Sequence, residues 1–248
     1  MHILQARRVT KHFGGLAAVS LVDFDLREGE ILGLIGPNGS GKTTLVNVIT
    51  GMLPYTDGKV QFKSQTIQGL PAHEIGQLGL TRTFQVVKPF RNLTVLQNVM
   101  VGALFGARGG ARDLASAHRK AEEVLEFVGL AHKAHAQAES LGVPERKRIE
   151  LARALAMRPT LLFLDEVMAG LNPAEIDEAV GLIKRIRDRG ITLVVIEHVM
   201  KAIRKLSDRI MVLFHGEKLT EGLPDEVLNN PAVVSAYLGR RYAEQAHA

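Results

Sequence analysis

The sequence predicts an α/β fold with a mostly parallel sheet, a small antiparallel β-subdomain and a helical insertion. Three observations lead to this prediction. Four short apolar runs are uninterrupted, as expected for strands buried on both faces of a parallel sheet, and helical patterns separate them. Two other stretches carry short strand patterns bounded by turn residues, which is typical of antiparallel pairs. A long middle segment contains several helical patterns and no convincing strand.

The order of the apolar runs predicts the parallel sheet, because alternation of strands and helices along the chain favours an α/β arrangement. The best-defined helix begins with Asn172 as a cap and Pro173 in the first turn, and Gly190 is expected to end it. Its apolar stripe consists of Ile176, Val180 and Ile183. The four predicted strands are ILGLI (31–35), LLFL (161–164), TLVVI (192–196) and IMVLF (210–214).

The remaining elements lie outside this alternation. Short antiparallel strands are predicted in residues 1–30 and in about 56–68, where turn residues separate the strand patterns. From about residue 90 to residue 157 we expect helices, with ARGGAR (107–112) as a flexible loop. The helix after that loop has an apolar stripe made of Leu114, Ala117, Ala121, Val124, Leu125 and Val128.

These elements predict a single domain over residues 1–248. Its α/β core with the antiparallel strands takes residues 1–85 and 158–248, and a helical subdomain takes residues 86–157. The chain contains no internal repeat and no long low-complexity tract. We therefore expect one continuous core that a helical insertion interrupts.

Composition narrows the class of protein. The 248 residues are 46% hydrophobic and 23% charged, which is typical of a globular chain. No segment approaches the roughly 18 consecutive apolar residues of a membrane span, and the first residues lack the apolar run of a signal peptide. The absence of cysteine excludes disulfides and a thiol nucleophile. Although the net charge is +5, the basic residues are scattered along helices, so we expect no direct binding of nucleic acid.

A phosphate loop, GPNGSGKTT from Gly36 to Thr44, directly follows the first apolar strand and directly precedes a helix. Its glycines let successive backbone N–H groups point inward, and the helix N-terminus adds positive potential. Lys42 would reach the β- and γ-phosphates, and the Thr43 hydroxyl would ligate Mg²⁺. The chain is therefore expected to bind a nucleoside triphosphate. The predicted nucleotide-binding residues are Phe13, Gly36, Asn38, Gly39, Ser40, Gly41, Lys42, Thr43 and Thr44.

Acidic and polar residues follow the other predicted strands at the same edge of the sheet. Asp165 and Glu166 end the run LLFLDE, where Asp165 would hold Mg²⁺ and Glu166 would orient and deprotonate the attacking water. His198 follows TLVVIE and could bridge the γ-phosphate and the water. Gln85 could contact both Mg²⁺ and water from the start of the insertion. Phe13 could stack on a base, although a Phe near a strand end is often a core residue.

The order of these motifs resembles the ATP-binding subunits of ABC transporters over nearly the whole chain. Closer similarity to the LivG-like ATPases of branched-chain amino-acid uptake comes from several short stretches. They are KHFGGLAAV, RTFQ followed by FRNLTVLQNVMVG, DEVMAGLNPAE, VIEHVM and VVSAYLG. The resemblance implies a P-loop ATPase core, with ATP and Mg²⁺ as cofactors.

The resemblance also implies a head-to-tail pair of ATPases, in which each ATP lies between one subunit's phosphate loop and the other's signature loop. That loop normally reads Leu-Ser-Gly-Gly-Gln and precedes a helix, which here is expected to begin at Pro144. This chain departs from the pattern because Gly142 lacks the serine hydroxyl and Pro144 has no backbone N–H. Ala169 and Asn172 also stand where Ser and Asp are common. The degenerate signature loop is Leu141, Gly142, Val143, Pro144 and Glu145.

The resemblance implies an energy-coupling subunit of an importer for branched-chain amino acids or related small amides. The chain would pair with itself or with a different ATPase, and would offer the partner a degenerate signature loop. Alternatively, the loop works through its remaining backbone groups, or the transporter runs on a modified cycle. Membrane-spanning subunits would contact the surface from Phe84 to Val101. The chain would lie on the cytoplasmic face of the membrane. A binding protein on the other side of the membrane would take part only indirectly. A lipid or lipopolysaccharide exporter ATPase and a soluble ABC ATPase acting on nucleic acid or ribosomes are the alternatives.

Overall fold

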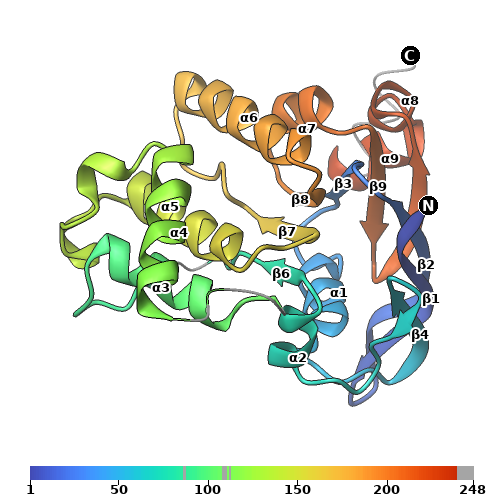
Figure 1. The fold of residues 1–248 in the computed structure, drawn as a ribbon. Helices are drawn as coiled ribbons and strands as arrows, with labels where there is room; N and C mark the ends of the chain where they lie inside the picture. Colours follow the sequence, from blue (N-terminus) through green and yellow to red (C-terminus); the bar gives the residue numbers. More distant parts are fainter. Residues whose placement is uncertain (86–87, 108–110, 112, 239–248) are drawn as a thin grey trace.

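A computed structural model describes residues 1–85, 88–107, 111 and 113–238. Its larger sheet has six strands in the order β10-β9-β3-β8-β7-β6, and all neighbours are parallel except the β10–β9 pair (Figure 1). The prediction of a mostly parallel sheet is therefore confirmed. The strands are β3 (Ile31–Ile35), β6 (Leu80–Arg82), β7 (Leu161–Asp165), β8 (Thr192–Ile196), β9 (Arg209–Phe214) and β10 (Glu217–Gly222).

A second, antiparallel sheet has the order β2-β1-β4-β5 and lies on the opposite side of the molecule from the helical insertion (Figure 1). The sequence predicted short strands here, but β1 and β2 have 12 residues each. Register shifts interrupt the pairing of β1 with β2, and Arg8 and Leu21 have positive φ values of 50°. These irregularities break the alternation of side chains, so that one long strand resembles several short ones. The strands are β1 (His2–Phe13), β2 (Leu16–Arg27), β4 (Asp57–Phe62) and β5 (Gln65–Thr66).

The helices divide between the sheet and the insertion. In Figure 1, α3, α4 and α5 gather on one side of the molecule, while α6 and α7 lie together over the parallel sheet. The predicted loop 107–112 falls mostly outside the described residues. The insertion contains α3 (Val95–Phe105), α4 (Leu114–Phe127), η1 (Ala131–Lys133), η2 (Ala138–Ser140) and α5 (Val143–Ala156). The other helices are α1 (Lys42–Ile49), α2 (Ala72–Gln77), α6 (Pro173–Asp188), α7 (Met200–Leu206), α8 (Pro224–Leu228) and α9 (Pro231–Leu238).

The predicted helix ends are accurate where capping decides them. The Asn172 side chain accepts a hydrogen bond of 3.0 Å from the backbone N–H of Glu175, and Pro173 is the first residue of α6. Gly190 follows the helix with a φ of 85°. The predicted stripe of α4 is buried except for Leu114, which is 67% exposed. Leu114 is the first helical residue, and periodicity defines a face without showing how far neighbouring elements cover it.

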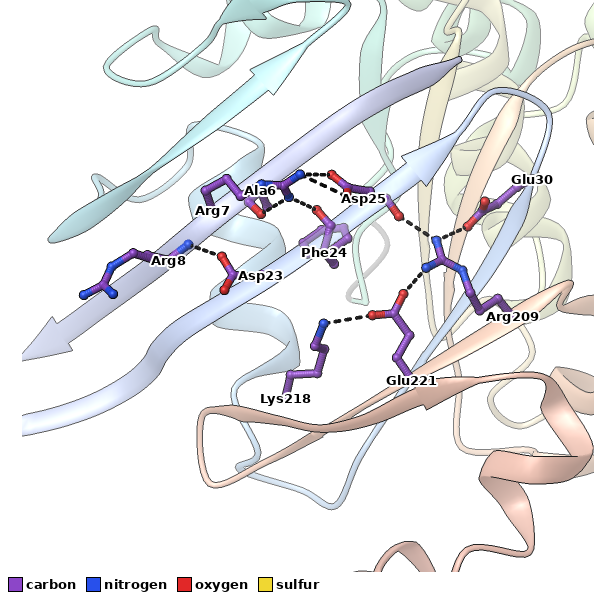
Figure 2. A network of polar contacts seen from close by, with 10 residues as sticks. All are labelled: Ala6, Arg7, Arg8, Asp23, Phe24, Asp25, Glu30, Arg209, Lys218 and Glu221. Atoms are coloured by element: carbon purple, nitrogen blue, oxygen red, sulfur yellow. Dashed lines mark hydrogen bonds and ion pairs between the residues drawn. The ribbon is translucent and has the colours of Figure 1, made fainter.

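The two sheets are joined by an arginine (Figure 2). From β9, the Arg209 guanidinium donates 2.6 Å hydrogen bonds to Glu30 and to the Asp25 carbonyl, and it also contacts Glu221 on β10. The three side chains are only 10–25% exposed, and the two carboxylates raise the pKa of Arg209 despite its burial. Because Asp25 belongs to β2, this arginine connects the antiparallel sheet to the parallel one.

We expect Arg209→Ala to lower the free energy of unfolding by roughly 2–3 kcal/mol, since it leaves two mostly buried carboxylates without their common cation. Urea denaturation at neutral pH measures the change. The control is Arg7→Ala, whose ion pair with Asp25 is 47% and 30% exposed and is expected to contribute less than about 1 kcal/mol. Equal effects of the two substitutions would contradict this account.

Among the described residues, every helix is too short or too polar to cross a lipid bilayer.

Candidate functional site

The phosphate loop lies between β3 and α1, as its sequence context predicts. Gly36 and Gly41 have φ values of 154° and 100°, which other residues rarely adopt. A Cβ atom would lie 2.2 Å from the Leu213 carbonyl oxygen at Gly36 and 2.4 Å from that of Ala18 at Gly41. Both positions therefore require glycine, because neighbouring backbone leaves no room for a side chain.

The loop has the features of an anion site. The Lys42 Nζ lies inside it, 2.7 Å from the Gly36 carbonyl oxygen and 3.0 Å from that of Pro37, and burial lowers the Lys42 pKa. Within the described part of the chain, no side chain caps α1, and the buried Ser40 hydroxyl has no hydrogen-bond partner. Free N–H groups, an unpartnered hydroxyl and a lysine fit the oxygens of a polyphosphate.

Three residues predicted from separate motifs meet at one carboxylate. The Gln85 Nε2 donates a 2.6 Å hydrogen bond to Oε2 of Glu166, and the His198 Nε2 lies 2.6 Å from Oε1. Glu166 itself has a φ of 50°, an unusual value for a residue other than glycine. The carboxylate of Glu166 is thus oriented from both sides, as a group that must position a water molecule would be.

The adjacent Asp165 is 3% exposed, and an arginine that sequence reasoning missed binds it. The Arg82 NH2 lies 2.9 Å from Asp165 Oδ2, and NH1 of the same guanidinium contacts Asn47 on α1. Burial raises the pKa of Asp165, and the Arg82 charge opposes that shift. The sequence did contain a signal for this role, because Arg82 ends a strand three residues before Gln85. Only the fold shows that this strand lies beside β7, which carries Asp165.

The residues present fit a magnesium ion. Thr43, Gln85 and Asp165, predicted from three motifs, all line one groove and offer the hard oxygen ligands that Mg²⁺ prefers. Within the described ranges, no three His, Asp or Glu side chains cluster as a metal site. A magnesium ion here would therefore complete its coordination with phosphate and water oxygens.

A second missed residue, Glu150, connects α5 to the segment that carries Gln85. It is 7% exposed and accepts a hydrogen bond from the backbone N–H of Phe84. Burial raises the Glu150 pKa to about 7. Its position in the middle of a helix gave no signal, because an acidic residue there is usually solvated. The contact ties the helical subdomain to the rim of the site.

The helix after the signature loop was predicted to begin at Pro144, and it begins one residue earlier. α5 begins at Val143, one residue before Pro144, with Gly142 as the cap. The cap closes the first turn through a 3.0 Å bond from the Arg146 N–H to the Gly142 carbonyl, and proline fits the second helical position, whose N–H has no intrahelical acceptor. Glu145 turns back on its own helix, where its Oε2 accepts a 3.1 Å hydrogen bond from the Gly142 N–H. The Glu145 carboxylate therefore lies at the first turn of α5, where it occupies the Gly142 N–H.

Phe13 belongs to the antiparallel sheet, whereas Glu166 and His198 follow strands of the parallel sheet. It ends β1 at the tip of a hairpin and is 48% exposed, so it is a surface residue, not a core residue. Lys11 Nζ lies 5.1 Å from its ring centroid. An exposed aromatic ring is available to stack on a base, and that role remains a prediction. The other predicted nucleotide-binding residues, Asn38, Gly39 and Thr44, lie in the phosphate loop.

A groove of about 620 Å³ opens beside the site, between α1, the Gln85 segment and the helices α3 and α5. Three large apolar side chains on its walls are exposed: Met52 by 50%, Phe84 by 45% and Phe105 by 71%. The lining continues to Asp165 at the catalytic edge. Exposed apolar side chains grouped in this way are typical of a binding surface.

Comparison with known proteins agrees with this geometry. Residues 19–169 match the family model described as ABC transporter, and residues 217–243 match that described as branched-chain amino acid ATP-binding cassette transporter. The chain is similar to the high-affinity branched-chain amino acid transport ATP-binding protein LivG of Salmonella typhimurium. The two are 40% identical over 249 residues, which cover 96% of this chain and 98% of LivG.

Solved structures of ATP-binding cassettes are also similar to this chain. The ADP conformation of an ATP-binding cassette of an ABC transporter superposes with a TM-score of 0.86 at 32% identity, covering 97% of this chain and all of that one. A dimeric, post-hydrolysis ATP-binding cassette bound to ADP and Pi gives a TM-score of 0.80 at 27% identity, covering 89% of this chain and 98% of the other.

Proposed function

Because the chain belongs to the ABC transporter family of ATPases, we propose that it is the ATP-hydrolysing subunit that drives uptake of branched-chain amino acids or related small amides. The observation that supports this most directly is the Glu166 carboxylate, which Gln85 and His198 orient beside a complete phosphate loop. Uptake is favoured over a lipid exporter or a soluble ATPase acting on nucleic acid, because the relatives are named for amino-acid transport.

The chain's own residues divide the chemistry. The inward N–H groups of the phosphate loop and Lys42 bind the phosphates and stabilise the charge that develops on the γ-phosphoryl group. Glu166 accepts a proton from the attacking water, and His198 and Gln85 keep its carboxylate in position. A magnesium ion bound by Thr43, Gln85 and Asp165 would neutralise phosphate charge. Before Asp165 can act there, its ion pair with Arg82 must loosen or be shared.

The signature loop limits which ATPase can complete an active site with this chain. ATPases of this family dimerise, as the similar ADP-bound cassette does. This chain would supply an intact phosphate loop to one site, which the signature loop of a different ATPase completes. Its own loop offers the partner's ATP no hydroxyl at Gly142, no N–H at Pro144 and a carboxylate at Glu145. These properties favour a heterodimer with one active site over a pair of identical chains.

The groove beside the site would receive a cytoplasmic helix of the membrane-spanning subunits. Movement of residues 86–157 would then carry that helix as ATP binds and leaves, with Gln85 at the hinge. The chain would thus lie on the cytoplasmic face of the cell membrane, and a binding protein outside would deliver the solute. No direct contact with nucleic acid is expected, because the positive charge is dispersed along helices.

We expect Phe105→Glu to abolish solute uptake while the ATPase active site stays intact, since a charge in an apolar contact costs several kcal/mol, about a hundredfold or more in binding. The measurement is ATP-driven uptake of labelled leucine by proteoliposomes that contain this chain, a second ATPase and the membrane subunits. Leu114→Glu is the matched control, because Leu114 is 67% exposed, close to the 71% of Phe105, but is not among the residues that line the groove. Equal uptake by the two variants would argue against the docking site, and no uptake by the unmodified complex would argue against the function.

A further inference from the structure

The helix behind the signature loop makes a direct contact with the backbone of the catalytic carboxylate. Lys147 of α5 reaches across to the turn after β7, where its Nζ donates hydrogen bonds to the carbonyl oxygens of Glu166, at 3.0 Å, and Ala169, at 2.6 Å. We propose that Lys147 is a positioning residue, which keeps Glu166 in its catalytic orientation and links that orientation to the signature loop. The proposal rests on the function proposed above.

The backbone of Glu166 needs such support. Its φ of 50° is unfavourable for a residue with a Cβ, and such a conformation persists only where the surroundings stabilise it. On one side the Glu166 N–H donates to the Ile196 carbonyl at 2.9 Å. On the other side Lys147 is a charged donor to the carbonyl, and hydrogen bonds from charged groups are the stronger ones. The two contacts together fix the peptide planes on both sides of Glu166.

The same lysine also closes the turn that follows. The Ala169 N–H approaches the Glu166 carbonyl at 3.3 Å, and Lys147 bonds the carbonyls at both ends of this turn. Among the described side chains of the site, Gln85 and His198 orient the carboxylate, whereas Lys147 orients the backbone that carries it. A small displacement of that backbone would move the carboxylate away from the attacking water.

The position of Lys147 on α5 gives the contact a second consequence. Lys147 lies about one helical turn after Val143, the first residue of the helix, so it moves with the signature loop. In a dimer that loop faces the partner's nucleotide, whereas Glu166 serves the nucleotide of this chain. A shift of α5 by about 1 Å away from the turn would lengthen the 2.6 Å hydrogen bond to the edge of the hydrogen-bond range. Lys147 would therefore couple occupancy of the partner's site to hydrolysis in this one.

The test compares Lys147→Met with the unmodified chain in the complex with its partner ATPase. We expect kcat for ATP to fall about 10- to 100-fold, because small misplacements of a catalytic group have effects of that size, while the KM for ATP changes less than twofold. Lys147→Arg should restore most of the activity. Lys205→Met is the matched control, since Lys205 is also a lysine in an ion pair, with Asp177 between α7 and α6, and that pair includes none of the site residues.

Hydrogen–deuterium exchange adds a readout that does not depend on turnover. In Lys147→Met, exchange should rise in peptides covering residues 166–171 and stay unchanged in the phosphate loop. A kcat within twofold of the unmodified complex would overturn the proposal. So would a parallel loss of ATP binding and thermal stability, which would mean that Lys147 only supports the fold. If the unmodified complex itself hydrolysed no ATP, the proposed function would fail instead.

Discussion

Replacing Glu166 with Gln is expected to lower ATP turnover about a thousandfold, because general-base catalysis contributes roughly 10²–10⁴-fold and the amide cannot accept the proton of the water. The amide keeps the size of the side chain and can still contact Gln85 or His198, so the site should stay folded. ATP binding should persist, since the phosphate contacts come from the phosphate loop. Steady-state phosphate release and equilibrium binding of labelled ATP measure the two effects separately.

The matched control is Glu123→Gln, because Glu123 is a 67% exposed residue of α4 that pairs with Lys120 at the surface. It should leave both turnover and ATP binding unchanged. Turnover by Glu166→Gln above about a tenth of the unmodified rate would show that another group accepts the proton. His198 is a candidate, because its Nε2 lies 2.6 Å from Oε1 of Glu166. Loss of ATP binding together with turnover would show instead that the substitution disturbs the phosphate loop.

The second large effect concerns the signature loop. We expect this chain alone to hydrolyse ATP at least a hundredfold more slowly than its mixture with an ATPase that carries an intact Leu-Ser-Gly-Gly-Gln loop. A hydrogen bond to a charged group contributes about 1.5–3 kcal/mol, and two such bonds to the γ-phosphate are missing at Gly142 and Pro144. The Glu145 carboxylate also occupies the Gly142 N–H, which raises the cost of bringing a polyanion there. Turnover measured over a wide range of protein concentration, with and without the partner, tests this.

Rebuilding the loop provides the converse experiment. Four substitutions together should give this chain a working loop: Gly142→Ser, Val143→Gly, Pro144→Gly and Glu145→Gln. ATP turnover by this variant in the absence of a second ATPase should then rise with the square of its concentration. The single substitution Glu145→Gln separates the charge from the missing donors, because it removes the negative charge and leaves Pro144 in place. Turnover by the unmodified chain alone that already rises with the square of concentration would contradict the asymmetric pair and show that the native loop binds ATP.

These predictions also bear on how the two halves of the molecule communicate. Glu150 and Lys147 both lie on α5, and they contact the Gln85 segment and the Glu166 turn respectively. The helix that begins at the signature loop therefore touches the site at two points. Movement of the helical subdomain would change both contacts together, which is the behaviour expected of a subunit whose hydrolysis follows the state of its partners.

The features that could be predicted from the sequence depend on residues that are close together in the chain. The phosphate loop, the Asp165–Glu166 pair after a buried strand, the Asn172 cap and the parallel strands could all be predicted, because turn chemistry, capping and burial patterns depend on residues close together in sequence. The mostly parallel sheet and the helical insertion followed from the order of those patterns. The precise start of α5 could not be predicted, since a cap and a proline in adjacent positions each define a plausible first residue.

The tertiary structure alone decided which distant side chains meet. Arg82 binds Asp165 across 83 positions and Lys147 binds the Glu166 backbone across 19, and neither partner could be chosen from the chain. Leu114 has the periodicity of a core residue and is exposed, and Glu145 turns toward its own helix. The physical reason is the same in each case. Local propensity selects the element and the face, whereas the packing of elements against one another selects the contacts that carry the chemistry.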